Sequence, residues 1–361
     1  MYTLSLEVVN KCNLNCSYCY LGEKKNTSMS IDTAKKAIEI AVHEVQKQYD
    51  KTLVIYFIGG EPLIAFNVIY EIVAYTKSRC MEMNLKYMFS ITTNGTLLTK
   101  KIIDFFIKDK FEIKLSLDGS QEVHDLNRKD YQNVGSFLTI INKLKLLRKY
   151  EKESDKKVSY AHVVTKNNYQ HFEKNFQFLI DLGAERVETG IDYYCTWNND
   201  EMKGLGIQIV NVFALYKNQV QIEKKRIYWN LLEHYLEMYL TTCNFYACKA
   251  GLNSMFVAVN GKIYTCIELP EFQIGSIMEG LNIQRIREIA YVEDKLSESC
   301  INCKYKSICK TRGCQASNYE IHRNIYEPVE VKCRMTKVFL NLIENNFTSQ
   351  QLENLKIRED R

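Results

Sequence analysis

Three cysteines stand together in the run Cys12-Asn-Leu-Asn-Cys16-Ser-Tyr-Cys19, directly after the first predicted strand at residues 4–9. Three thiolates at this spacing can bind three irons of a four-iron, four-sulfur cluster, and no fourth cysteine lies nearby in the sequence. One iron would stay open for chemistry, whereas a cluster held by four cysteines mainly transfers electrons. The alternative is a zinc site completed by a histidine or a distant cysteine, although zinc sites favour closer cysteine pairs. The run therefore favours an iron–sulfur site at the end of a strand.

The first 200 residues alternate short β-branched runs with amphipathic helical stretches. Candidate strands lie at residues 4–9, 53–57, 87–92, 113–117, 158–164 and 187–191. Such alternation predicts an α/β fold with parallel strands and right-handed crossovers. Six units would form a partial (β/α)6, TIM-like barrel over residues 1–200, followed by a helical bridge at 201–242. Functional residues of such barrels gather at the carboxyl ends of the strands.

Glycine-rich and polar segments follow the predicted strands, where a barrel would place its site. Gly59-Gly60-Glu61-Pro62 follows the second strand, Asn94 follows the third, and Asp118 follows the fourth. Each can also be explained as turn chemistry, since Gly-Gly, Asn-Gly and Asp-Gly pairs all form turns. Because all three segments follow predicted strands, we nevertheless expect them to lie on one face of the barrel and to form the functional site there.

The cysteine run resembles the CxxxCxφC signature of radical S-adenosylmethionine (SAM) enzymes, with Tyr18 at the aromatic position, and residues 59–62 resemble the GGEP motif of that family. The resemblance implies that Cys12, Cys16 and Cys19 are catalytic cluster ligands. It also implies that the open iron binds the amino and carboxylate groups of SAM, and that reductive cleavage yields a 5′-deoxyadenosyl radical.

The same resemblance implies a set of SAM-binding residues at the strand ends. These are Tyr18, Gly59, Gly60, Glu61, Asn94, Ser116 and Arg128. A second interpretation stays open for Asp118 and Arg128, which could form an internal ion pair that organises a loop.

Most of the remaining cysteines lie in the C-terminal third: eight of the 13 fall between Cys243 and Cys333. Residues 254–265 form an alternating pattern around Asn260-Gly261, which predicts a β-hairpin with a two-residue turn. Eight cysteines suit two closed four-iron clusters. Two structural zinc sites would fold the same loops and are the alternative.

This region resembles the SPASM domain, an auxiliary-cluster extension of radical SAM enzymes that modify peptides. The resemblance covers residues 243–335, which a C-terminal helix and tail at 336–361 would follow. It implies one cluster on Cys248, Cys266 and Cys314, with Cys243 as the fourth ligand, and a second on Cys300, Cys303, Cys309 and Cys333. With the SAM-binding cluster, the expected cofactors are three [4Fe-4S] clusters and SAM.

The resemblance implies maturation of a ribosomally made peptide by a net two-electron oxidation, giving a thioether or carbon–carbon cross-link. Alternatives are an anaerobic sulfatase-maturating enzyme, which converts Cys or Ser to formylglycine, and a peptide epimerase. Sulfatase maturases carry an aspartate base directly after the second SPASM cysteine. Here Ile267 and then Glu268 follow Cys266, and Glu268 is the candidate base. A non-catalytic iron–sulfur or zinc scaffold is the remaining interpretation.

Partners follow from the same expectations. The substrate is a peptide or protein, and the reductant is a flavodoxin or ferredoxin. The chain begins at the first barrel strand without a winged-helix domain, so leader recognition would require a separate protein, the barrel surface or a very short precursor. A net charge of +5 indicates no nucleic-acid partner. With no apolar run of membrane-spanning length and an odd cysteine count, we expect no membrane partner and a reducing cytoplasm.

Overall fold

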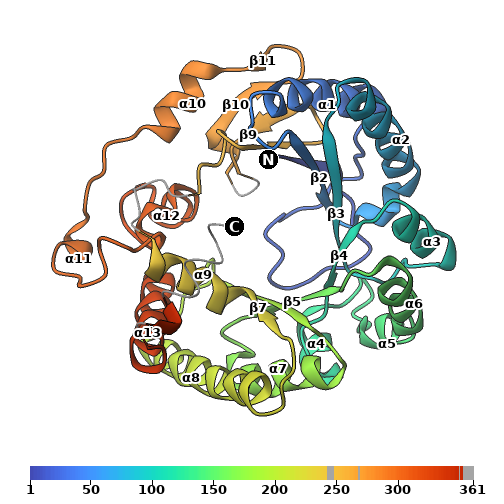
Figure 1. Cartoon of the computed structure of the whole chain (residues 1–361). Helices are drawn as coiled ribbons and strands as arrows, with labels where there is room; N and C mark the ends of the chain where they lie inside the picture. Colours follow the sequence, from blue (N-terminus) through green and yellow to red (C-terminus); the bar gives the residue numbers. More distant parts are fainter. Residues whose placement is uncertain (242–247, 267–268, 349, 353–361) are drawn as a thin grey trace. The chain divides into compact units, whose positions relative to one another are not determined.

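The computed structural model describes residues 1–241, 248–266, 269–348 and 350–352 (Figure 1). The chain divides into two compact units. One comprises Met1–Ala161 and Lys249–Tyr291, and the other comprises His162–Cys248 and Val292–Arg361. The domain boundaries that we inferred from the sequence stay predictions.

A parallel sheet forms the centre of the first unit. Its strands are β1 (Tyr2–Val9), β2 (Thr52–Gly59), β3 (Lys86–Thr93), β4 (Glu112–Ser116) and the start of β5 (Ser159–Val164), in this order across the sheet. Every neighbouring pair is parallel. The connecting helices include α1 (Ile31–Val45), α2 (Phe66–Glu82), α3 (Lys100–Lys108), α5 (Phe137–Ile141) and α6 (Leu144–Ser154). Figure 1 shows α1, α2 and α3 along one side of these strands. The predicted α/β class is confirmed.

Local sequence explains where these helices begin and which side they bury. The Ser30 side chain accepts a hydrogen bond from the Thr33 N–H at 3.0 Å and caps α1. Thr99 caps α3 in the same way through the Ile102 N–H at 3.3 Å. The buried residues of α1 recur at helical spacing: Ala34, Ala37, Ile38, Ala41, Val42 and Val45.

The remaining strands of this unit come from the C-terminal third of the chain. They are β8 (Ser254–Val257), β9 (Lys262–Tyr264), β10 (Gln273–Ser276) and β11 (Gly280–Leu281), followed by α10 (Ile283–Ala290). β8 pairs with β1 in parallel, and β8, β9, β10 and β11 are antiparallel neighbours. The hairpin of β8 and β9 is present, but the prediction of a two-residue turn was wrong. The Ala258 N–H donates to the Lys262 carbonyl at 3.0 Å, which leaves three loop residues ending in Gly261 at φ 82°.

The second unit is mainly helical. It contains α7 (Phe172–Asp181), β6 (Arg186–Ile191), α8 (Asn199–Gln221), β7 (Tyr228–Trp229), α9 (Asn230–Leu240), α11 (Glu298–Ile301), α12 (Gln315–His322) and α13 (Glu330–Asn346). Its core surrounds the fully buried Trp229, whose ring lies 5.2 Å from Phe176 of α7 and 5.4 Å from Phe339 of α13. Aromatic packing therefore joins α13 to helices that precede it by more than a hundred residues.

Candidate functional site

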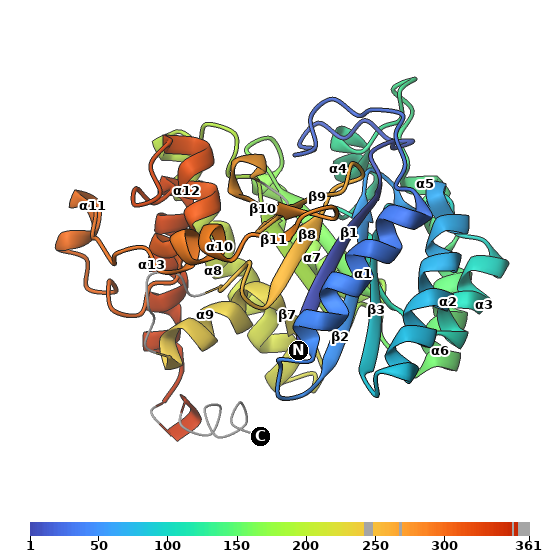
Figure 2. The same ribbon diagram turned by 90° about the horizontal axis from the view of Figure 1, so that it is seen from above.

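The loop that carries Cys12, Cys16 and Cys19 lies at the carboxyl end of β1. The end of α4 (Gln121–Asn127) and the segment after it hold the loop in place. The Asn15 N–H donates to the Lys129 carbonyl at 2.7 Å, and the Ser17 N–H donates to the Asn127 carbonyl at 3.0 Å. The Ser17 hydroxyl also donates to Asn127 Oδ1 at 2.7 Å. In Figure 2 this dark-blue loop lies beside α4 at one end of the strands. Residues more than a hundred positions apart thus fix the shape of the loop.

The three thiols of this loop interact electrostatically. Cys12 is buried, whereas Cys16 and Cys19 are partly exposed. Burial raises the pKa of Cys12 to about 11, and the charge on Cys16 raises it further. Burial also raises the pKa of Cys16, with a further rise from Cys19. A cysteine thiol binds a metal only after it has lost its proton. A cationic cluster would supply the positive charge that favours the deprotonated form. The donor set therefore fits a cluster with three cysteine ligands.

The half-buried Tyr18 belongs to a network of three side chains with the buried Asp118 and Arg128. Its hydroxyl donates to Asp118 Oδ2 at 2.6 Å, and Arg128 Nε lies 3.1 Å from the same oxygen. The Arg128 guanidinium also lies over the Tyr18 ring, 5.3 Å from its centre. The internal ion pair between Asp118 and Arg128, left open by the sequence, is therefore present. It couples the cysteine loop to the strand end after β4.

Asn94 occupies the end of β3 and faces the cysteine loop. Its Nδ2 donates to Asn13 Oδ1 at 2.9 Å and lies 4.0 Å from the Cys12 sulfur. Its Oδ1 accepts hydrogen bonds from the N–H and the hydroxyl of Thr96. Ser116 is buried at the end of β4 and makes no side-chain hydrogen bond to a described residue. Asn94 is thus already bound to the cysteine loop, while the hydroxyl of Ser116 has hydrogen-bonding capacity left for a ligand.

Gly59 and Gly60 bring the end of β2 against the start of the cysteine loop. The Gly60 N–H donates to the Val9 carbonyl at 2.8 Å, and the Glu61 N–H donates to the Lys11 carbonyl at 3.0 Å. A Cβ on Gly60 would lie 2.3 Å from the Lys11 oxygen, and one on Gly59 would lie 2.1 Å from the Val9 oxygen. Both positions therefore require glycine because backbone approaches backbone.

Glu61 is 1% exposed and uses both carboxylate oxygens inside the protein. Oε1 accepts from the Leu63 N–H at 3.1 Å and from the Thr93 hydroxyl at 2.7 Å, and Oε2 accepts from the Asn94 N–H at 2.7 Å. Burial raises the pKa of Glu61 to about 7, although these three donors oppose the rise. The Glu61 side chain thus ties the end of β2 to the end of β3.

Gly60→Ala is expected to lower the free energy of unfolding by about 3 kcal/mol, because the new methyl group meets fixed backbone oxygens rather than a movable side chain. Gly206→Ala is the matched control, since a Cβ on Gly206 in α8 would meet only Val338 at 3.6 Å. Removing glycine from a helix interior should leave stability equal or higher. Chemical denaturation of both variants checks this, and equal stability of the two would contradict the close-approach argument.

His124 organises the same strand end. Its Nδ1 accepts the Asp118 N–H at 3.3 Å, and its Nε2 lies 2.9 Å from the Ser136 hydroxyl, which donates to the Arg128 carbonyl at 2.8 Å. Burial lowers the pKa of His124 to about 4, so the ring is neutral at pH 7. The tautomer with its proton on Nε2 satisfies both contacts. Nothing in the spacing of Asp118, His124 and Ser136 along the chain could have revealed these hydrogen bonds.

Cys300, Cys303, Cys309 and Cys333 come together in the second unit. The Cys303 N–H donates to the Cys300 carbonyl at 3.1 Å, and Cys333 lies in the first turn of α13. Burial raises the pKa of Cys333, and charge on each of the other three thiols raises it further. Among described residues no three Cys, His, Asp or Glu side chains could share a single metal ion. A four-iron cluster does not require that, because each thiolate binds a different iron.

Cys248 and Cys314 line one cavity of about 490 Å³ in the second unit, together with His234, Lys310 and Lys332. Cys266 belongs to the first unit. Cys243 and Glu268 lie outside the described residues, so their predicted roles carry no structural account. The ligand set of the first auxiliary cluster stays a prediction. None of the helices in the described part of the chain is long and apolar enough to cross a membrane.

The similarity to known proteins extends over most of the chain. A cysteine-type anaerobic sulfatase-maturating enzyme of Clostridium perfringens (strain 13 / Type A) is 29% identical over 84% of this chain and 86% of its own length. A radical SAM cyclopropyl synthase, TigE, of Paramaledivibacter caminithermalis is 26% identical over 85% of this chain and 66% of its own length. The solved structure of native anSMEcpe with bound AdoMet and Kp18Cys peptide has a TM-score of 0.77 at 22% identity, covering 98% of this chain and 99% of that chain.

That likeness in fold confirms the predicted fold class. Residues 6–192, which include the cysteine loop, the Gly59–Pro62 turn and the strand ends described above, match the radical SAM superfamily. The chain is therefore a radical SAM enzyme, a member of a family that uses a [4Fe-4S] cluster and S-adenosylmethionine.

Proposed function

We propose that this enzyme matures a peptide by a net two-electron oxidation that forms a thioether or carbon–carbon cross-link. The observation that carries the proposal is that the chain has two sets of cysteines of different kinds. One is the three-cysteine loop after β1, and the other is the four-cysteine group in the second unit. A cluster on the first group would leave one iron open for chemistry, and a cluster on the second group would be closed and would suit electron transfer.

In this proposal Cys12, Cys16 and Cys19 hold the SAM-binding cluster. When bound, this cluster and SAM supply a 5′-deoxyadenosyl radical that removes a hydrogen atom from an unactivated carbon. The residues around the loop position it: Tyr18, Asp118 and Arg128 fix its far side, while Gly60 and Glu61 fix its start. Ser116 and Asn94 lie at the neighbouring strand ends, where SAM contacts are expected.

The auxiliary clusters complete the proposed cofactor set of three [4Fe-4S] clusters. Cys300, Cys303, Cys309 and Cys333 would hold one, and Cys248, Cys266 and Cys314, with Cys243 as fourth ligand, would hold the other. Hydrogen-atom removal takes one electron and one proton from the substrate, and bond formation releases a second electron and a second proton. A cluster held by these cysteines would supply an acceptor for that electron, and a base such as Glu268 would take the proton.

Two relatives support a peptide or protein substrate, since a structure of similar fold binds the Kp18Cys peptide and another relative is a sulfatase-maturating enzyme. Formylglycine formation is therefore the second candidate. Ile267 stands where the sulfatase maturases are expected to carry an aspartate base, which favours a different oxidation. We also propose a flavodoxin or ferredoxin as reductant, and a reducing cytoplasmic setting that keeps the thiols available for clusters.

Anaerobic assay of the reconstituted enzyme with SAM and reductant tests the proposal on two substrates. One is the product of a short open reading frame sought beside the enzyme's gene, and the other is the Kp18Cys peptide. We expect the first to lose two hydrogen atoms and to yield one 5′-deoxyadenosine per product, with a new cross-link seen by tandem mass spectrometry. An aldehyde on Kp18Cys instead would establish the second candidate. Formation of 5′-deoxyadenosine with neither peptide altered would contradict both.

A further inference from the structure

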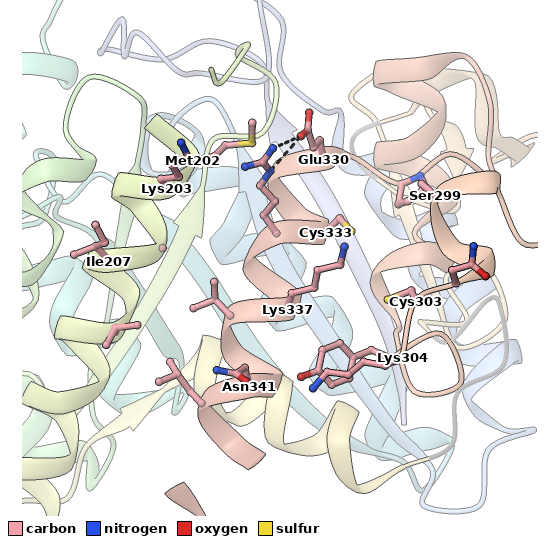
Figure 3. Close-up of a pocket in the computed structure, with 18 of the residues that line it drawn as sticks. Met202, Lys203, Ile207, Ser299, Cys303, Lys304, Glu330, Cys333, Lys337 and Asn341 are labelled. Atoms are coloured by element: carbon pink, nitrogen blue, oxygen red, sulfur yellow. Dashed lines mark hydrogen bonds and ion pairs between the residues drawn. The ribbon is translucent and has the colours of Figure 1, made fainter. Parts of the chain in front are cut away.

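A wide groove in the second unit runs between α8, α13 and the loop around Cys303. Its volume is about 1570 Å³, well above that of an ordinary small-molecule pocket. Figure 3 shows Met202, Lys203 and Ile207 on α8, Cys333 and Lys337 on α13, and Cys303 and Lys304 on the opposite wall. A space of this size suits a protein surface better than a metabolite.

Two cysteines of the proposed second auxiliary cluster line this groove. Cys303 and Cys333 are both partly exposed, whereas their companion Cys300 is buried. Since Cys303 and Cys333 both line the groove, a cluster bound to the four thiols would have one edge on the groove wall. An electron on that cluster would leave most directly through the groove.

Basic side chains outnumber acidic ones among the residues that line the groove. The basic side chains are Lys203, Lys304, Arg334 and Lys337, and the acidic ones are Glu327 and Glu330. Arg334 is paired with Glu330 at 2.8 Å, and Lys304 is paired with Glu344 at 2.8 Å. Lys337 makes no hydrogen bond or ion pair with a described residue, and Figure 3 shows it extending toward Cys333. Lys203 is 70% exposed and forms an ion pair with the exposed Asp200 at 3.5 Å, which solvent weakens.

Apolar side chains complete the surface. Ile207 and Val210 of α8 are 62% and 44% exposed, and Val338 and Leu342 of α13 also line the groove. Exposed apolar area beside Lys337, which has no acidic partner among the described residues, is typical of a surface that binds a protein briefly. Redox partners form small interfaces of this kind, and complementary charge guides their association.

We propose that this groove docks a small acidic one-electron carrier, such as a flavodoxin, on the second auxiliary cluster. The inference rests on the proposed function, which generates one electron for each substrate oxidised. The reduced cluster would lose that electron, and the oxidised carrier would gain it, taking up a proton from water where its flavin becomes a neutral semiquinone. Lys203 and Lys337 would attract the carrier, and Ile207 would contact it.

The double variant Lys203→Glu/Ile207→Glu tests the docking surface without touching a cysteine or its neighbours in sequence. The probe is oxidised flavodoxin, and its affinity for the reconstituted enzyme is measured by titration at low and at high salt. We expect at least about a tenfold weaker Kd for the variant at low salt, with little difference at high salt. Lys174→Glu/Ile222→Glu is the matched control. It makes the same charge change at exposed positions of the same unit that do not line the groove.

Iron content separates failure of this inference from failure of the proposed function. If both variants carry wild-type iron and bind flavodoxin as the wild type does, the groove is not the docking site. Equal weakening in the control would mean a general charge effect and would also overturn the inference. If the wild-type protein holds no cluster on Cys300, Cys303, Cys309 and Cys333, the proposed function itself fails.

Discussion

Cys12→Ala/Cys16→Ala/Cys19→Ala is expected to abolish the formation of 5′-deoxyadenosine from SAM. The loop supplies all three protein ligands for the open-iron cluster, so their loss removes the site where SAM would be cleaved. The surrounding contacts of Asn15, Ser17 and Tyr18 do not depend on the thiols, and the fold should persist. Chromatographic quantification of 5′-deoxyadenosine under anaerobic, reducing conditions is the measurement.

Cys80→Ala is the matched control for this loss. Cys80 is a buried thiol of α2 in the same unit, and burial raises its pKa to about 11, as expected for an inert structural cysteine. The control should cleave SAM at close to the wild-type rate. Appreciable cleavage by the triple variant, or loss of cleavage in the control, would show that the loop is not the SAM-binding site.

The second large effect is expected from Cys303→Ala/Cys333→Ala. This variant should lose about four irons, keep SAM cleavage, and fail to oxidise the peptide. The physical reason is that hydrogen-atom removal needs only the loop after β1, whereas the second electron needs an acceptor. Parallel measurement of 5′-deoxyadenosine and of the peptide mass separates the two steps. Wild-type yields of oxidised peptide from a protein with four fewer irons would contradict the assignment of electron transfer to this cluster.

The sequence predicted the parts of the site that depend on spacing along the chain. The cysteine run falls after β1, and residues 59–62 fall after β2, because a parallel sheet places both at the same strand ends. The helical stripe of α1 and the hairpin of β8 and β9 were also predictable from periodicity. The sequence pattern was sufficient to predict a feature wherever the residues in contact belong to the same regular element.

The parts that could not be predicted depend on contacts between distant loops. Glu61 binds the end of β3, and His124 links Asp118 to Ser136, but nothing in the spacing of these residues identifies their partners. The parallel pairing of β8 with β1 joins segments some 250 residues apart, and only packing reveals it. The hairpin turn differs from expectation because Ala258 pairs with Lys262, which adds Val259 to the loop ahead of Asn260 and Gly261.

Iron bound per chain after anaerobic reconstitution tests the central claim most directly, measured for the wild type and for Cys12→Ala/Cys16→Ala/Cys19→Ala. Three clusters predict about twelve irons in the wild type and about eight in the triple variant. About four irons falling to none, with zinc bound instead in the C-terminal third, would contradict the account. The four-cysteine group would then be a structural zinc site, and neither the two-electron oxidation nor the docked electron carrier would remain.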